Sequence, residues 1–281
     1  TTDTDTFNVA VGYAAGAAST TGINNTLIGA GAGDALTDAD TNVAVGGFAL
    51  TNDTLGSKSV AIGHSALEAQ NFTTATDTHN TAVGDNVGKA ITTGVENTLM
   101  GSAAGDALTT GIRNVVMGFA ALTADTKGQH NVAIGYTALF AQNFTSATSS
   151  YNTAVGSGAG GAVTTGVQNT IVGGLAGDAM TTGDSNTFIG YFAAGNGIVT
   201  GDTNTAVGVS AGLALTSGSN NLLLGKDAGR TGSPGGNFTA GNSAIVLGDE
   251  NIGDAHIQVD WTVASDARDK TDFTALDLGL D

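Results

Sequence analysis

Asn80-Thr81-Ala82-Val83-Gly84 is one of fourteen short segments of the form Asn-x-x-x-Gly, or close to it, that recur along this chain of 281 residues. The intervals between their first residues are 17 residues nine times, 21 residues three times and 18 residues once. Repeats of this length are typical of solenoids, in which one short structural unit stacks on the next. The sequence therefore predicts a repeat array with units that begin at Asn8, Asn25, Asn42, Ser59, Asn80, Asn97, Asn114, Asn131, Asn152, Asn169, Asn186, Asn204, Asn221 and Asn242.

The composition limits the class of protein. With 44 Gly, 1 Pro, 12% charged and 41% hydrophobic residues, the chain is predicted to be ordered but built from small side chains. A net charge of -17 opposes binding to nucleic acid, and without a long apolar run we expect no membrane insertion. The absence of cysteine excludes disulfides and thiolate metal sites. Because the chain begins at Thr1 without a leader, we expect a fragment or processed product whose N-terminal region is missing.

Each unit, numbered from its first residue, has the same pattern. Position 4 is a sizeable apolar residue and position 5 is Gly in the first thirteen units, and position 8 is Ala in twelve of them, with Val87 the exception. Short β-branched runs separated by Gly and by Thr-Thr-Gly predict one coil with two short strands per unit. Gly at position 5 indicates a positive φ or a close backbone neighbour, and repeated Asn predicts a ladder of side-chain amides. The predicted fold class is an all-β parallel solenoid of 17-residue coils.

Both faces of the first strand carry side chains suited to burial. Position 3 lies opposite position 4 and is large in several units, as in Leu27, Leu99 and Ile171 at a period of 72 residues. Ordering a residue costs about 1 to 2 kcal/mol, and Ala and Gly bury little apolar area in return, so a single thin coil is marginally stable. We therefore expect further copies of the chain to cover one face around a symmetry axis.

The units resemble the head repeats of trimeric adhesins of the YadA type, and the 17-residue version is similar to repeats of phage tail fibres. The resemblance covers residues 8 to 248 and rests on segments such as Asn80 to Gly84 and Asn131-Val132-Ala133-Ile134-Gly135. It implies a left-handed parallel β-roll wound as a homotrimer.

A second resemblance concerns Ser265-Asp266-Ala267-Arg268-Asp269-Lys270-Thr271-Asp272, which is similar to the start of the peptidase S74 family, an intramolecular chaperone of phage fibres. In that family the chaperone trimerises the fibre and is then released by cleavage after the Ser. The resemblance implies Ser265 as nucleophile and Lys270 as base, at most for a single self-cleavage. Asp269 and Phe273 depart from the family pattern, and a carboxylate beside Lys270 would raise the pKa that catalysis needs lowered.

Other candidate sites are few. Asp34, Asp106 and Asp178 are 72 residues apart, about 19 Å at four coils, and cannot share one ion within a chain, although symmetry copies of one Asp could meet at an axis. The four His residues (His64, His79, His130 and His256) are scattered, so we expect no metal and no cofactor. The longer units carry Phe72 and Phe144 in loops, where they either pack on the next coil or contact a receptor. Trp261 would lie near a host-facing tip, as the resemblance to fibres implies.

These observations predict three segments: a repeat β-roll over 1–241, a capping β region with the tip over 242–264, and the start of a chaperone over 265–281. The predicted function is a structural and receptor-binding segment of a bacteriophage tail fibre in the virion. Its expected partners are two further copies of itself, a host cell-surface glycan or protein receptor, and other tail proteins. Two alternatives are open: the head of a bacterial trimeric adhesin, or the non-catalytic part of a glycan-degrading tailspike.

Overall fold

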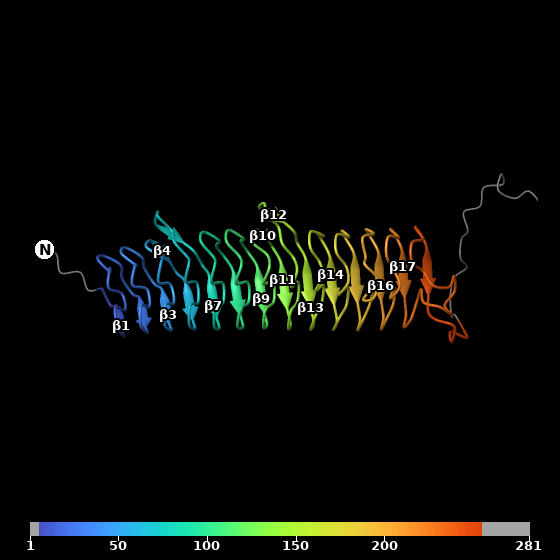
Figure 1. Cartoon of the computed structure of the whole chain (residues 1–281), viewed down its shortest axis with the longest axis horizontal. Coiled ribbons are helices and arrows are strands. Elements are labelled where there is room, and N and C mark those ends of the chain that lie inside the picture. The colour runs from blue at the N-terminus through green and yellow to red at the C-terminus, as the bar shows by residue number, and fades with distance from the viewer. Residues whose placement is uncertain (1–5, 255–281) are drawn as a thin grey trace, which may run out of the picture. The chain divides into compact units, whose positions relative to one another are not determined.

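The computed structural model describes residues 6–254, and it confirms an all-β parallel solenoid. One fourteen-stranded parallel sheet runs along the stack of coils, one strand per coil (Figure 1). No helix that could cross a membrane is present among the residues described. The strands of this main sheet are β1 (Val9–Val11), β2 (Thr26–Ile28), β3 (Val43–Val45), β5 (Val60–Ile62), β7 (Thr81–Val83), β8 (Thr98–Met100), β9 (Val115–Met117), β11 (Val132–Ile134), β13 (Thr153–Val155), β14 (Thr170–Val172), β15 (Thr187–Ile189), β16 (Thr205–Val207), β17 (Leu222–Leu224) and β18 (Ile245–Leu247).

The prediction of two strands in every coil was wrong for most coils. Within residues 6–254 a second strand forms only at the coils that begin at Ser59 and Asn131, where β4 (Gly56–Ser57) pairs with β6 (Thr76–Asp77) and β10 (Gly128–Gln129) pairs with β12 (Thr148–Ser149). Elsewhere the Thr-Thr-Gly segments are turns that hydrogen-bond to the next coil one residue at a time, as when Thr92 N donates to Thr109 O at 2.9 Å. The Thr hydroxyls bond to the same carbonyls, which satisfies these segments without an extended ladder.

The main sheet keeps one register along its length, because each strand occupies positions 2 to 4 of its coil. Thr81, Ala82 and Val83, for example, pair with the residues 17 further on in the next strand. Position 3 points into the solenoid and is buried on every coil from β2 to β18, whereas positions 2 and 4 point outward. We expected both faces of the strand to be buried, and within a single chain this holds only for the inner face.

The interior is filled from one chain. Position 3 contributes large side chains on some coils, such as Leu99 and Phe188, and Ala on others, while position 8 contributes buried Ala or Val87. The coils therefore share one thin apolar core within the chain, which the small residues at position 8 make narrow.

Gly at position 5 has both properties predicted from the sequence, a positive φ and a closely approaching backbone on the neighbouring coil. Gly118 has a φ of 136°, and a Cβ built on it would lie 2.3 Å from the carbonyl oxygen of Gly135 on the next coil. Any side chain there would force neighbouring coils apart, so the tight stacking requires glycine.

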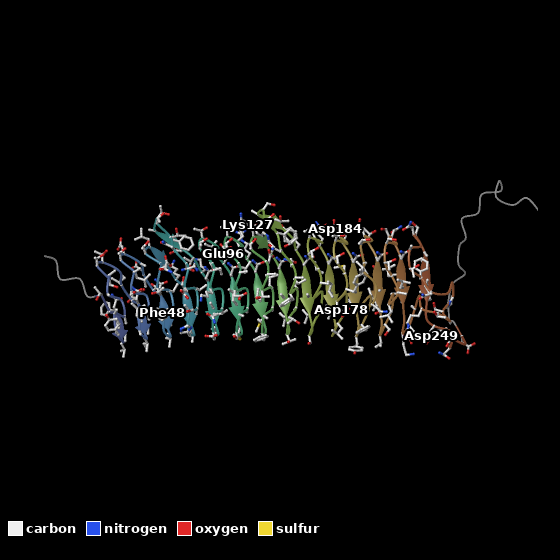
Figure 2. All side chains as sticks on the ribbon, in the orientation of Figure 1. Phe48, Glu96, Lys127, Asp178, Asp184 and Asp249 are labelled. Atoms are coloured by element: carbon white, nitrogen blue, oxygen red, sulfur yellow. The ribbon has the colours of Figure 1, made fainter. Side chains whose placement is uncertain are left out.

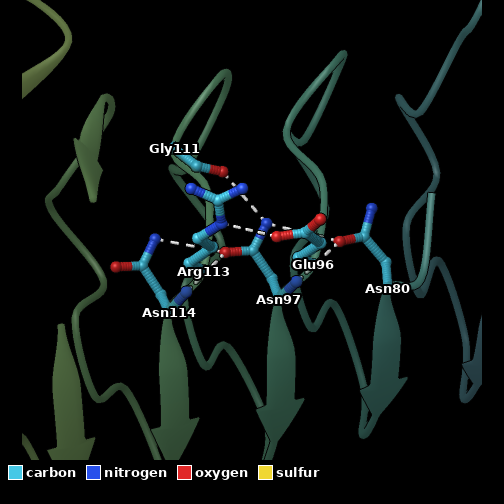
Figure 3. Close-up of polar contacts among 6 residues, drawn as sticks. All are labelled: Asn80, Glu96, Asn97, Gly111, Arg113 and Asn114. Carbon is cyan, nitrogen blue, oxygen red and sulfur yellow. Dashed lines mark hydrogen bonds and ion pairs between the residues drawn. The ribbon is translucent and has the colours of Figure 1, made fainter. Parts of the chain in front are cut away.

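The Asn residues at position 1 form the expected amide ladder (Figure 3). Asn97 Oδ1 accepts hydrogen bonds from the backbone nitrogen of Asn114 at 3.0 Å and from its Nδ2 at 3.1 Å. Asn97 Nδ2 donates to Gly111 O at 3.0 Å, which closes the turn within its own coil. The ladder residues from Asn25 to Asn221 are at most 3% exposed, so each amide joins two coils in a dry environment.

The last unit begins two residues later than predicted. β18 pairs Ile245 with Leu222, which puts Ala244 rather than Asn242 at position 1. Asn221 Oδ1 accepts from Ala244 N at 3.0 Å, and Asn242 Oδ1 instead accepts from Ser219 N at 2.7 Å, two residues before Asn221. The regular sheet therefore continues through Leu247, and the unit of stacked coils ends at Glu250.

Candidate functional surfaces

The outer sheet face, defined as positions 2 and 4 of the fourteen main-sheet strands, is uncharged and mostly apolar. Position 4 is Val, Ile, Leu or Met on every strand, and position 2 is Val, Thr, Leu or Ile. Six of the position 4 side chains are exposed, from 37% at Ile62 to 57% at Val11, and the others are partly buried. A continuous apolar strip of this length on a chain of net charge -17 is typical of a surface that another protein covers.

Charged groups lie instead along the two long edges of the stack of coils, beside the ends of the sheet strands. Figure 2 shows Glu96, Lys127 and Asp184 on one edge, and Asp178 and Asp249 on the other. Glu96 pairs with Arg113 of the next coil at 2.5 Å, and Lys58 pairs with Asp77 at 2.6 Å. These pairs are half exposed, so they neutralise local charge and contribute little stability.

The 21-residue coils that begin at Ser59 and Asn131 are each preceded by a coil in which a buried carboxylate replaces an apolar core residue. On six other coils position 12 is filled by a buried apolar side chain: Leu36, Ile91, Leu108, Val163, Met180 and Leu215. On two pairs of neighbouring coils it is filled by Asp53 with Gln70 and by Asp125 with Gln142, and all four side chains are 0% exposed.

The buried pair directs the path of the longer coil. Asp125 Oδ1 accepts from the backbone nitrogens of Gly128 at 3.0 Å and Phe144 at 3.1 Å, and Oδ2 accepts from Gln142 Nε2 at 2.6 Å. Gln142 Oε1 in turn accepts from Asn152 Nδ2 at 2.8 Å, which joins the pair to the amide ladder. This arrangement satisfies a buried charge with three donors and holds the extra residues in place.

Phe72 and Phe144 are 7% exposed, so of the two alternatives foreseen for them, packing on a neighbouring coil or contact with a receptor, their burial agrees with packing. The three residues that follow each ring, 73–75 and 145–147, are exposed in loops that project from one edge of the stack (Figure 1). The loops thus present Thr, Ser and Ala side chains at their tips. Nothing in the sequence alone distinguished the buried rings from the exposed tips.

The three Asp residues at the 72-residue period occupy equivalent places on their coils but have different partners. Asp34 accepts from Thr51 Oγ1 at 2.6 Å, and Asp106 accepts from Thr123 in the same way. Asp178 faces Gly195 where the other coils have Thr, and its Oδ1 is buried without a partner. Burial raises the pKa of the Asp178 carboxyl, because desolvation disfavours the charged form.

No group of three or more potential ligands that could hold a metal ion occurs within residues 6–254. Of the His residues in that range, His64 lies 3.6 Å from Asp85, and His130 stacks on Tyr151 at a centroid distance of 4.8 Å. Both contacts join neighbouring coils. A groove of about 350 Å³ lies where the first residues of β16, β17 and β18 meet the preceding turns, lined by Thr203, Thr205, Asn220, Asn221, Leu222, Ser243, Ala244 and Ile245.

The remaining predicted site residues, Ser265, Lys270 and Trp261, lie outside the described residues, as do His256 and Phe273. The candidate surfaces of the described part are therefore the outer sheet face, the two edges and the loop tips. Comparison of the chain with protein-family models, with curated proteins and with solved structures finds no match.

Proposed function

We propose that this chain is a structural and receptor-binding segment of a bacteriophage tail fibre that works as a homotrimer. The observation that carries the proposal is the outer sheet face, which is uncharged along all fourteen strands and carries an apolar side chain at position 4 of each one. Two further copies of the same chain would cover this face with surfaces that have the same length and the same spacing between coils.

A partner made of the same coils fits this face better than an unrelated globular protein does. The face is a narrow strip only two side chains wide, repeated at about 4.8 Å per coil. Copies aligned around an axis parallel to the stack would place equivalent rungs side by side, so that every Val, Ile or Met meets an apolar neighbour. The charged groups, which lie on the edges, would stay in water.

The fibre assignment depends on the resemblance of the repeats and of the Ser265 to Thr271 stretch to phage fibre sequences. A rod whose charges and loops lie at its edges suits a protein that is exposed to solvent along its length. Host attachment is the function of such fibres. Catalysis enters the proposal only as a single self-cleavage at Ser265.

Attachment is tested by incubating the fluorescently labelled protein with bacterial strains that differ in their surface polysaccharides. We expect adhesion to a subset of strains, and adhesion to none would refute the receptor-binding role. Val155→Lys places a charge at the centre of the outer sheet face and should abolish both the trimer and the adhesion. Ser146→Lys adds the same charge at an exposed loop tip and should preserve the trimer.

A further inference from the structure

Exposed aromatic side chains gather on one edge of the stacked coils. We call this the aromatic edge: positions 6 and 7 of each coil, directly after the Gly that ends the sheet strand. Its exposed rings are 50% to 87% accessible, and they belong to Tyr13, Phe48, Phe119, Tyr136 and Tyr191. Figure 2 shows Phe48 on this edge, opposite the edge that carries Glu96 and Lys127.

The rings form pairs. Phe48 meets His64 edge to face at a centroid distance of 5.9 Å, Phe119 stacks on Tyr136 at 5.7 Å, and Tyr191 lies tilted against Phe192 at 5.5 Å. Such contacts hold each ring in a fixed orientation, so a ligand would lose little entropy in ordering them.

The three ring pairs are evenly spaced. Phe48, Phe119 and Tyr191 lie on the third, seventh and eleventh coils, so consecutive pairs are four coils apart. At about 4.8 Å per coil the spacing is about 19 Å. A ligand that contacts all three pairs must be a long chain.

In two of the pairs, one ring packs directly on a glycine of the preceding coil, where no side chain intervenes. A Cβ on Gly31 would lie 3.2 Å from Phe48 Cδ1, and a Cβ on Gly174 would lie 3.5 Å from Tyr191 Cδ2. These rings therefore rest on the backbone of the preceding coil, with their other side open to solvent.

The second ring pair has neutral surroundings. Positions 6 and 7 of its own two coils and of the coils on either side carry no charge, and they include the hydroxyls of Ser102, Tyr136, Thr137 and Ser157. Flat rings bordered by hydroxyls suit a sugar, because one face of a pyranose presents C–H bonds that stack on a ring while its hydroxyls form hydrogen bonds. A net charge of -17 disfavours acidic polymers.

We propose that the aromatic edge binds a neutral polysaccharide, with sugar rings stacked on the three ring pairs along the rod. This inference rests on the proposed receptor function and names the chemistry of the receptor. Three weak contacts on one polymer bind much more tightly than one, because the second and third contacts form within the same complex.

The test compares wild type with Phe119→Ala/Tyr136→Ala, which removes the second ring pair. The control is Phe7→Ala/Tyr151→Ala, which removes an exposed Phe and an exposed Tyr that each lie directly before the Asn at position 1 of the next coil, away from the aromatic edge. Affinity electrophoresis with dextran, mannan, galactan and the acidic polymer alginate measures binding, and sedimentation velocity measures the oligomeric state.

Wild type is expected to bind at least one neutral polymer and not alginate, and the ring-pair variant should lose about tenfold in affinity while the control stays within about twofold. Three results would overturn the inference: no neutral polymer binds, the ring-pair variant binds as well as the control, or that variant changes the oligomeric state, which would put the rings between copies. Adhesion of wild type and the ring-pair variant to bacteria distinguishes the two proposals. If the wild type and the ring-pair variant adhere equally well, binding by the ring pairs is refuted but the receptor role is not. If neither protein adheres, the receptor role itself is refuted.

Discussion

Asn97→Ala tests the amide ladder that joins the coils. The substitution removes four hydrogen bonds of the side chain and leaves two backbone groups, Gly111 O and Asn114 N, without their partners (Figure 3). Asn97 is 0% exposed, so water does not replace those bonds in the intact fold. Each orphaned group costs about 1 to 3 kcal/mol, so the expected loss in the free energy of unfolding is about 2 to 6 kcal/mol.

The assay is urea denaturation followed by far-UV circular dichroism, with hydrogen exchange of the Asn114 amide as a local probe. The control is Asn52→Ala, in which an exposed Asn loses one hydrogen bond to Glu68 O and the stability should change by about 0.5 kcal/mol or less. Exchange at Asn114 should rise strongly in the first variant and stay unchanged in the control.

Equal midpoints for the two variants would refute the reasoning, because they would show that the buried amide contributes no more than a surface amide. A serine at this position is also informative. Ser59 replaces Asn in one coil, but there Gln70 Nε2 donates to its hydroxyl at 2.9 Å and Thr78 lies within 2.5 Å. Asn97→Ser lacks these partners and should be almost as damaging as Asn97→Ala.

Three further predictions concern single coils. Gly118→Ala should destabilise the fold by about 3 kcal/mol or more, because its Cβ meets backbone at a φ unsuited to Ala, whereas Gly161→Ala should cost less than about 1 kcal/mol in the same urea titration. Asp125→Ala removes the acceptor of three buried donors and should lower the free energy of unfolding by about 3 kcal/mol or more. The control Asp77→Ala, at an exposed ion pair, should lower it by less than about 1 kcal/mol. Equal losses in the two variants would contradict a role for Asp125 in holding the loop at 145–147. Asp178→Asn should stabilise the protein at pH 7, because the pKa of Asp178 is higher in the folded protein than in the unfolded chain. The wild type therefore loses stability as pH rises from the unfolded pKa through the folded pKa, and the advantage of the variant should vanish below about pH 4. An advantage that does not depend on pH would contradict this cause.

The repeat pattern predicted the fold class because its strongest signals are backbone requirements. Gly at position 5 marks a place where coils approach too closely for a side chain, and Asn at position 1 marks a place where buried backbone groups need an amide. Both signals recur at the coil length, so a solenoid follows from them directly. The last unit shows that Gly is the more reliable marker: Gly248 fixes Ala244 as position 1, and the nearby Asn242 has a different role.

Features that depend on packing between coils were harder to predict. The Thr-Thr-Gly segments have strand-like composition, but their hydroxyls bond to the next coil and make a second strand unnecessary. The loops around Phe72 were recognised as insertions, yet the burial of its ring depends on Asp53, which lies one coil earlier and holds the Phe72 nitrogen at 3.0 Å. The aromatic edge was missed because position 6 is variable, and two of its three ring pairs form between residues of neighbouring coils.

The central claim is that further copies of the chain cover the outer sheet face. Sedimentation velocity of the purified protein at micromolar concentration tests it most directly. A single boundary with the mass of three chains, replaced by one of a single chain in Val155→Lys, is the predicted result. A folded wild-type protein that sediments as a single chain would contradict the claim.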